Sequence, residues 1–212
     1  MSIGRRTVLK GMGLAGLAGL SLSHMSLAGA AQKTSASQHK PLVVLVSSTD
    51  PQEGFVAGMQ AHPAAGQATV LHSDHSLQFI RAFEQRLSSG KQQRIIGLVD
   101  DASGMLLLDL ARSAGARVHW TGQHVTENGV SRHNLSTTPA AHGCVTQFAA
   151  LTEQCSRPVA LTEQYLSASR QWTAALGFAL TSPEPNRRYM RATPPADFKA
   201  LDGHYISFSI ET

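Results

Sequence analysis

Leu42-Val43-Val44-Leu45-Val46 and, further along the chain, Ile95-Ile96-Gly97-Leu98-Val99 are the stretches that decide the fold. Both are nearly continuous aliphatic runs, without alternation between apolar and polar residues. A strand of this kind is buried on both faces, as in parallel sheets that helices cover on each side. The two stretches therefore predict two central strands of an α/β protein.

The segments around these two strands alternate between strand and helix patterns. A short apolar run at 69–72 and an alternating run at 117–121 predict two more strands, the second with one wetter face. Helix patterns with polar residues at their starts occupy about 51–61, where Asp50 is the expected N-cap, 77–87 and 104–114. This order predicts an α/β fold, a three-layer sandwich with a mostly parallel sheet of Rossmann-like or flavodoxin-like type.

Beyond residue 125 the pattern is weaker. We expect a helix over 143–154 and a longer helix over about 160–180, followed by a loop rich in proline. Tyr205-Ile206-Ser207-Phe208-Ser209-Ile210 alternates between apolar and polar residues. This alternation predicts a C-terminal antiparallel strand at the edge of the sheet.

The first thirty residues have the parts of an export signal. Gly4-Arg5-Arg6-Thr7-Val8-Leu9-Lys10 precedes a Gly-rich stretch, and Ala28-Gly29-Ala30 supplies the small residues of a cleavage site. Arg5, Arg6, Leu9 and Lys10 resemble the twin-arginine (Tat) export motif, from which Gly4 and Val8 depart. The resemblance implies recognition by the Tat translocase through Arg5 and Arg6, cleavage after about Ala30, and a periplasmic location. The apolar stretch is too short for a span, so no stable membrane anchor is expected.

The whole chain is therefore expected to have four parts. They are a Tat-type signal peptide over 1–30, a flexible lead-in over 31–40, an α/β domain over 41–182, and a Pro-rich loop with an edge strand over 183–212 that packs on the same domain.

Charge and cysteine content exclude further classes of protein. The 212 residues include 18 Lys and Arg against 14 Asp and Glu, and three of the 18, Arg5, Arg6 and Lys10, lie in the leader. The remaining 15 nearly balance the acidic residues, so no nucleic-acid partner is expected. Two cysteines, Cys144 and Cys155, are too few for a disulfide scaffold or a four-cysteine metal site. In one continuous helix their Cα atoms would lie about 16 Å apart, too far for a disulfide bond.

Polar side chains follow each of the four predicted strands. The carboxyl ends of parallel strands meet at one edge of a sheet, and ligands of α/β proteins bind outside that edge. We therefore predict a small-molecule site there. The same residue types also cap helices, and Asp101 or Ser103 is expected to cap the predicted helix over 104–114. The candidate ligand-binding residues are Ser47, Ser48, Thr49, Asp50, Asp100, Asp101, Ser103, Gln123 and His124.

Two alternatives place chemistry at the same edge. His72 and His75 have an H-x-x-H spacing and, with Asp100 or His124, are candidates for a metal site of nitrogen and oxygen ligands. The Asp100-Asp101 pair resembles the acidic turn of receiver-like phosphotransfer domains, where carboxylates hold Mg²⁺ or accept phosphate, but export disfavours that chemistry. The chain has no G-x-S-x-G motif, so the nucleophile elbow of a hydrolase is not predicted. It has no Walker motif, so nucleotide hydrolysis is not predicted either.

These patterns lead to two functional hypotheses. The first is a periplasmic α/β protein that binds a small molecule or serves as an accessory partner of an exported redox enzyme. The second is a periplasmic enzyme with a metal- or acid/base-dependent site at the carboxyl ends of the strands. The residues leave open which cofactor the chain would use, and whether the chain is an enzyme.

Overall fold

The computed structural model describes residues 40–47, 52–128, 130–152, 164–168, 172–181 and 202–212. Its strands are β1 (Leu42–Ser47), β2 (Thr69–Ser73), β3 (Arg94–Asp100), β4 (Arg117–Glu127), β5 (Val130–Thr137), β6 (Gln164–Ala168) and β7 (Gly203–Glu211). Its helices are α1 (Glu53–Ala61), α2 (Leu77–Leu87), α3 (Asp101–Ser113), α4 (His142–Leu151) and α5 (Trp172–Thr181), with a short 3-10 helix at Pro139–Ala141. None of the helices in these ranges is long and apolar enough to span a membrane. The predicted leader and nearly all of the predicted lead-in lie outside the described residues.

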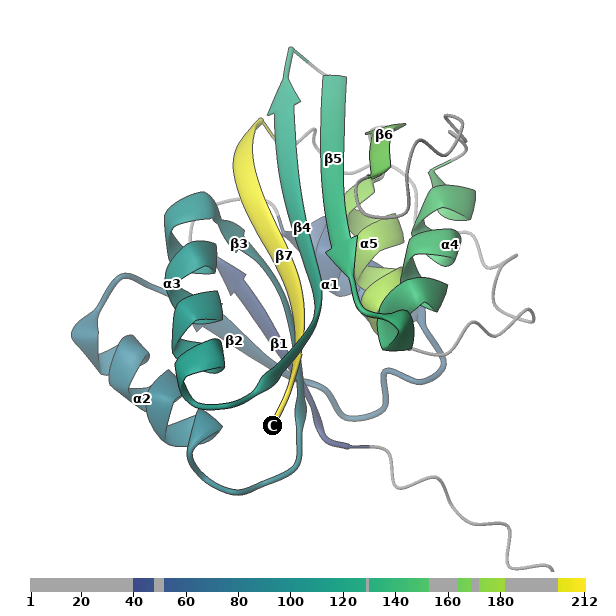
Figure 1. The fold of residues 1–212 in the computed structure, drawn as a ribbon. Coiled ribbons are helices and arrows are strands. Elements are labelled where there is room, and N and C mark those ends of the chain that lie inside the picture. The colour runs from purple at the N-terminus through teal and green to yellow at the C-terminus, as the bar shows by residue number, and fades with distance from the viewer. Residues whose placement is uncertain (1–39, 48–51, 129, 153–163, 169–171, 182–201) are drawn as a thin grey trace, which may run out of the picture. The chain divides into compact units, whose positions relative to one another are not determined.

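All seven strands join one open sheet in the order β2-β1-β3-β7-β4-β5-β6 (Figure 1). β1 is parallel to both β2 and β3, and this part has the 2-1-3 order with which flavodoxin-like sheets begin. The other four pairings are antiparallel. The α/β class is therefore confirmed, but the expectation of a mostly parallel sheet is wrong.

The C-terminal strand β7 lies in the middle of the sheet. It pairs antiparallel with β3 on one side and with β4 on the other. Its predicted direction is confirmed, but its predicted place at the edge is wrong. Ser207 and Ser209 are as deeply buried as Ile206, Phe208 and Ile210. The alternation in the sequence therefore separates an apolar core from a buried polar layer, and not from water.

A β4–β5 hairpin takes the place of the loop expected after residue 121. β4 continues to Glu127, and β5 returns from Val130 antiparallel to it. Asn128 has a φ of 53°, in the left-handed region. Residues 128–129 are Asn-Gly, a dipeptide that strongly predicts a β-hairpin turn. This signal could have predicted the hairpin from the sequence.

The long helix expected over about 160–180 is wrong in its first half. Gln164–Ala168 is the strand β6, which pairs with β5, and only Trp172–Thr181 is helical. Tyr165 and Leu166 fit a helical spacing, but the free edge of β5 offers backbone hydrogen bonds that outweigh a weak local preference. The helix expected over 143–154 is confirmed as α4, His142–Leu151.

Helices cover both faces of the sheet (Figure 1). We call the face covered by α1, α4 and α5 the α1 face, and the face covered by α2 and α3 the α3 face. In β1, Val44 and Val46 belong to the core on the α1 face, whereas Val43 and Leu45 belong to the core on the α3 face. The two cores explain why the sequence of β1 shows no alternation.

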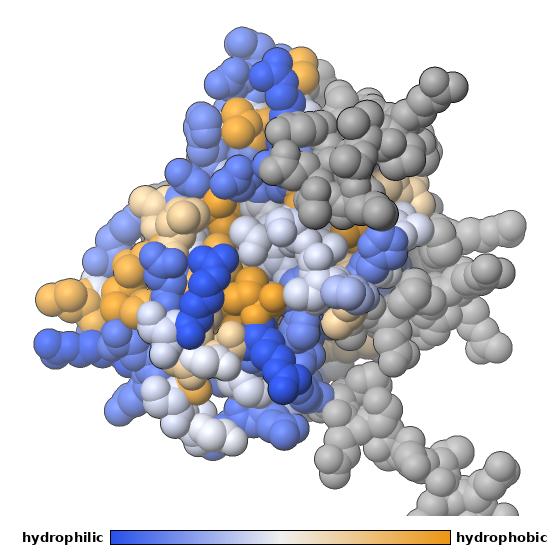
Figure 2. Space-filling model, in the orientation of Figure 1, coloured by the Kyte–Doolittle hydropathy of each residue, from blue (hydrophilic) through white to orange (hydrophobic). Residues whose placement is uncertain are grey.

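The surface of the described residues exposes four large apolar side chains. Its exposed large apolar side chains are Leu77 on α2, Met105 and Leu106 on α3, and Val130 at the start of β5. Figure 2 shows apolar patches over α2 and α3 that hydrophilic residues interrupt. Scattered apolar side chains of this kind are normal on a protein surface.

α1 and α5 cross so closely that glycine is required on both helices. A Cβ atom added at Gly58 would overlap the backbone of Ala174, and one added at Gly177 would overlap the carbonyl oxygen of Phe55. In both cases the obstacle is backbone, which cannot rotate away as a side chain can. The two glycines therefore set the distance at which α5 packs on α1.

We expect Gly177→Ala to lower the free energy of unfolding by about 1–3 kcal/mol or more, because the added methyl group forces the two helices apart. Urea denaturation followed by circular dichroism measures this loss. Gln60→Ala, an exposed change on α1, is the control and should stay within about 0.5 kcal/mol of the unaltered protein. Equal stability of the two variants would mean that the helices do not cross this closely.

Candidate functional site

The carboxyl ends of β1 and β3 lie side by side at a topological switch point. β1 and β3 are adjacent and parallel, but α1 packs on one face of the sheet and α3 on the other. The connections that follow the two strands therefore diverge. In open α/β sheets, ligands bind outside the strand ends between two such connections.

Four polar side chains meet at this switch point. Ser47 Oγ donates to Asp100 Oδ2 at 3.2 Å and accepts from the Asp100 backbone N–H at 3.0 Å. Asp100 Oδ1 accepts from the Ser103 backbone N–H at 2.9 Å, a bond that caps α3. His75 Nε2 lies 3.4 Å from Ser103 Oγ and 3.7 Å from Asp100 Oδ1. We call Ser47, His75, Asp100 and Ser103 the switch-point cluster.

The carboxylates at this end of the sheet are held in their charged form. Burial raises the pKa of Asp100, but hydrogen bonds from Ser103 and Ser47 and the nearby His75 outweigh it, so the pKa lies below its ordinary value. Hydrogen bonds from the side chain and backbone of Ser76 lower the pKa of Asp74. Ser76 in turn caps α2. The N-termini of α2 and α3 are thus each approached by a carboxylate of the protein itself, as their dipoles favour.

Two buried polar side chains at the same edge lack hydrogen-bond partners among the described residues. Ser73, the last residue of β2, is 3% exposed and its Oγ is unpartnered. Gln52, the N-cap of α1, is 4% exposed, and neither its amide nitrogen nor its amide oxygen has a partner. A buried polar group without a partner costs about 1–3 kcal/mol. Such groups therefore point to a molecule that would satisfy them.

Other predicted residues of this edge have different fates. Ser48, Thr49 and Asp50 lie outside the described residues. Asp101 is exposed in the first turn of α3. The expectation that Asp101 or Ser103 caps α3 is wrong. The N-cap is the preceding residue, Asp100, whose side chain accepts the Ser103 N–H.

Gln123 and His124 lie inside β4, so the expectation that they follow a strand is wrong. Gln123 is exposed, whereas His124 is buried on the α1 face. His124 Nδ1 lies 2.7 Å from His133 Nδ1, and His124 Nε2 lies 2.7 Å from Ser207 Oγ. The Trp120 indole N–H donates to the same Ser207 oxygen at 2.8 Å. No pattern or spacing of residues in the sequence indicates this network.

The order Ser207, His124, His133 is that of a nucleophile, a base and an orienting group. However, each of the three side chains is 1% exposed or less, so a substrate in solution does not reach the hydroxyl. Trp172 of α5 stacks on His124 with 4.7 Å between the ring centroids. We interpret the network as structural, because it joins β4, β5 and β7 to α5.

The amino end of β3 holds a second buried polar group. Arg94 is 7% exposed and donates to Ser209 Oγ at 3.2 Å and to the Thr181 carbonyl oxygen at 3.1 Å. Burial raises the pKa of the nearby Cys144 thiol, against the lowering effect of Arg94. Cys155 lies outside the described residues, so its relation to Cys144 is not tested.

The structure does not group metal ligands at the predicted histidines. Within the described ranges, no three side chains of His, Cys, Asp or Glu come together in a way that could hold a metal ion. His72 is exposed on β2, and His75 belongs to the switch-point cluster. A metal role for His72 and His75 stays a prediction.

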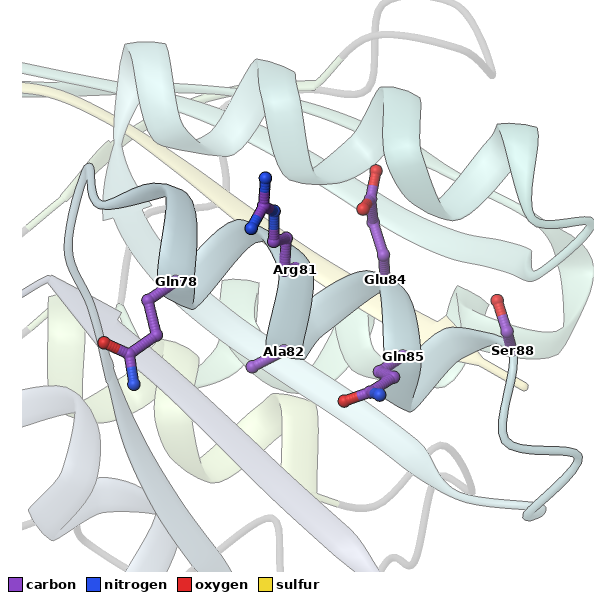
Figure 3. A pocket seen from close by; sticks show the side chains of 6 residues that line it. All are labelled: Gln78, Arg81, Ala82, Glu84, Gln85 and Ser88. Carbon is purple, nitrogen blue, oxygen red and sulfur yellow. The ribbon is translucent and has the colours of Figure 1, made fainter.

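A shallow pocket on α2 does not resemble a binding site. Figure 3 shows the side chains that line it, all from α2 or from the residue that follows it. A hollow along one helix does not bring groups from separate elements together, as the switch point does. The lining residues are Gln78, Arg81, Ala82, Glu84, Gln85 and Ser88.

Comparisons with protein-family models, with curated proteins and with solved structures give no match. The protein is therefore classified by its fold and its site alone. It is an α/β protein with an open mixed sheet and a polar cluster at the switch point of its parallel half.

The buried histidines predict a loss of stability in mild acid. Burial, with a smaller effect of Arg94, lowers the pKa of His62 to about 4, and burial lowers that of His133 to about 3. Burial and His133 place the pKa of His124 well below its usual value. Below pH 6.5 the unfolded chain binds more protons than the folded one. The free energy of unfolding should therefore fall by about 1.4 kcal/mol per pH unit for each histidine.

Urea denaturation at several values between about pH 7 and about pH 5 measures this slope, above the range in which carboxylates titrate. His133→Gln should make the slope shallower by one proton. His204→Gln, which changes an exposed histidine, should leave it unaltered. A slope that is the same in both variants would contradict a neutral, buried His133.

Proposed function

We propose that this chain is an exported protein that binds a small polar molecule at the switch point between β1 and β3. The observation that carries the proposal is the pair of buried, unpartnered polar side chains, Ser73 and Gln52, at the edge where the switch-point cluster lies. A bound molecule with hydrogen-bonding groups would offset their cost.

The arrangement of the cluster supports binding from solution. Ser47, Ser73 and Ser103 are buried hydroxyls that come from β1, β2 and α3. The side chain of His75 is 75% exposed, so the cluster borders solvent on that side. In small-molecule sites, a few polar groups placed by separate elements fix the orientation of the bound molecule.

Binding is favoured over acid/base catalysis at the same residues. The contact that supports an enzyme is the 3.7 Å approach of His75 Nε2 to Asp100 Oδ1. However, both oxygens of Asp100 already hold the protein together, one on Ser47 and the other on the α3 N-terminus. These bonds hold the pKa of Asp100 below its ordinary value, whereas an efficient general acid or base has a pKa near the working pH.

We further propose that residues 1–30 direct the chain to the periplasm through the Tat translocase, with cleavage after about Ala30. The support is the Arg5-Arg6 motif and the Ala28-Gly29-Ala30 site in the sequence.

Ser73→Ala tests the proposed binding site. The protein is expressed with its leader in a bacterium that has a Tat pathway, and mass spectrometry under native conditions detects molecules that remain bound. We expect one small molecule per chain in the unaltered protein and its loss in the variant. Removing an unpartnered buried hydroxyl should leave the free energy of unfolding equal or higher, so lost binding together with kept stability separates function from folding.

Ser131→Ala is the matched control, because it removes a buried hydroxyl on β5 that does have a partner, Thr126 Oγ1 at 2.9 Å. This control should lose about 1 kcal/mol of stability and keep the bound molecule. A protein that emerges with nothing bound, or a Ser73→Ala variant that retains the molecule, would overturn the proposed site. The same spectra report the mass of the chain, and a retained residue 1–30 segment would overturn the proposed export.

A further inference from the structure

The edge that carries the switch-point cluster is acidic. Asp74 directly follows β2, Asp100 ends β3, and Asp101 begins α3. Among the described residues, the only ionisable group whose charge acts on Asp74 or Asp100 is His75. Within the described part of the chain, no lysine or arginine charge acts on these two carboxylates, and this favours a cationic over an anionic ligand.

The N-termini of α2 and α3 are each approached by a carboxylate of the protein itself. Asp100 Oδ1 accepts the Ser103 N–H at the start of α3, and Asp74 Oδ1 accepts the Ser76 N–H just before α2. A phosphate or carboxylate ligand would have to displace these carboxylates, or lie beside them and be repelled. At α2 and α3 the arrangement therefore disfavours the anions that helix N-termini otherwise attract.

Ser73 gives an independent reason to place a ligand here. Ser73 pairs in register with Ser47 in the parallel β1–β2 ladder, and paired side chains lie on the same face of a sheet. Its unpartnered Oγ, 3% exposed, therefore lies on the face where Ser47 meets Asp100. A hydroxyl at this position can accept as well as donate.

We propose that the molecule bound at the switch-point cluster carries a protonated amine. This inference rests on the proposed function and names the chemical class of its ligand. An ammonium group has three N–H donors and a positive charge. Each oxygen of Asp100 accepts one bond within the protein and keeps a lone pair for a second, and the Ser73 oxygen adds another acceptor. Charge-assisted hydrogen bonds of this kind are among the strongest that a site can offer.

Three fragments of matched size test the class of ligand: ethanolamine, ethylene glycol and glycolate differ in carrying an ammonium, a second hydroxyl or a carboxylate. Each is titrated into the purified full chain after removal of any bound molecule, and ¹H–¹⁵N correlation spectra follow the amides of Ser73, His75 and Ser103. We expect ethanolamine to shift these amides in a saturable way, with an apparent Kd at least tenfold lower than that of either other fragment.

Asp100→Asn is the informative variant, because asparagine caps helices as well as aspartate does but carries no charge. We expect it to weaken ethanolamine binding at least tenfold while the spectrum of the rest of the protein is retained. Asp109→Asn, an exposed change further along α3 beside Arg112, removes the same charge and should leave binding unchanged.

Equal or tighter binding of ethylene glycol or glycolate, or no saturable shift with ethanolamine, would overturn the amine. So would an Asp100→Asn variant that binds ethanolamine as the unaltered protein does. The proposed binding function is judged separately, by whether a molecule that remains bound during purification is lost in Ser73→Ala. That outcome does not depend on the charge of the molecule.

Discussion

The antiparallel position of β7 between β3 and β4 is the constraint on which the rest of the structure depends. β3 and β4 run in the same direction, and β7 pairs with β3 over Tyr205–Glu211 and with β4 over Gly203–Glu211. A strand with one apolar face and one hydroxyl-bearing face thereby becomes the centre of the sheet. Ile206, Phe208 and Ile210 complete the apolar core on the α3 face. Ser207 and Ser209 form the middle of a buried polar layer on the α1 face.

This division makes the register of β7 highly specific, because a slip by one residue would move every serine into the apolar core. Two glycines on the neighbouring strands match the alternation. A Cβ at Gly97 would overlap the ring of Phe208, and one at Gly122 would meet Ser207 Oγ and His124 Nε2. Small residues thus stand where β7 presents a large side chain or a hydrogen-bonded one. The polar layer lowers the free energy of unfolding in acid, because its histidines are neutral in the folded protein and become protonated when the chain unfolds.

At the switch point, helix capping and ligand binding are not exclusive interpretations of the same residues. Asp100 caps α3 and at the same time holds the end of β1 through Ser47. These bonds keep the carboxylate charged and in one place, as a preorganised site requires. The side chains of Ser73 and Gln52 do not cap a helix. Both are buried and have no hydrogen-bond partner among the described residues. The capping carboxylate and the leftover polar groups together favour a ligand that donates hydrogen bonds.

By itself the sequence determined the elements of the parallel half and the residues at its carboxyl edge. Continuous aliphatic runs specify strands buried on both faces, and Ser47, His75, Asp100 and Ser103 follow from the rule that such strand ends converge. Only the tertiary structure decided the place of β7, the β5–β6 pairing and the partners of His124. Those depend on backbone hydrogen bonds between segments far apart in the chain, and such bonds leave no periodic trace in the sequence, since every residue carries the same donor and acceptor.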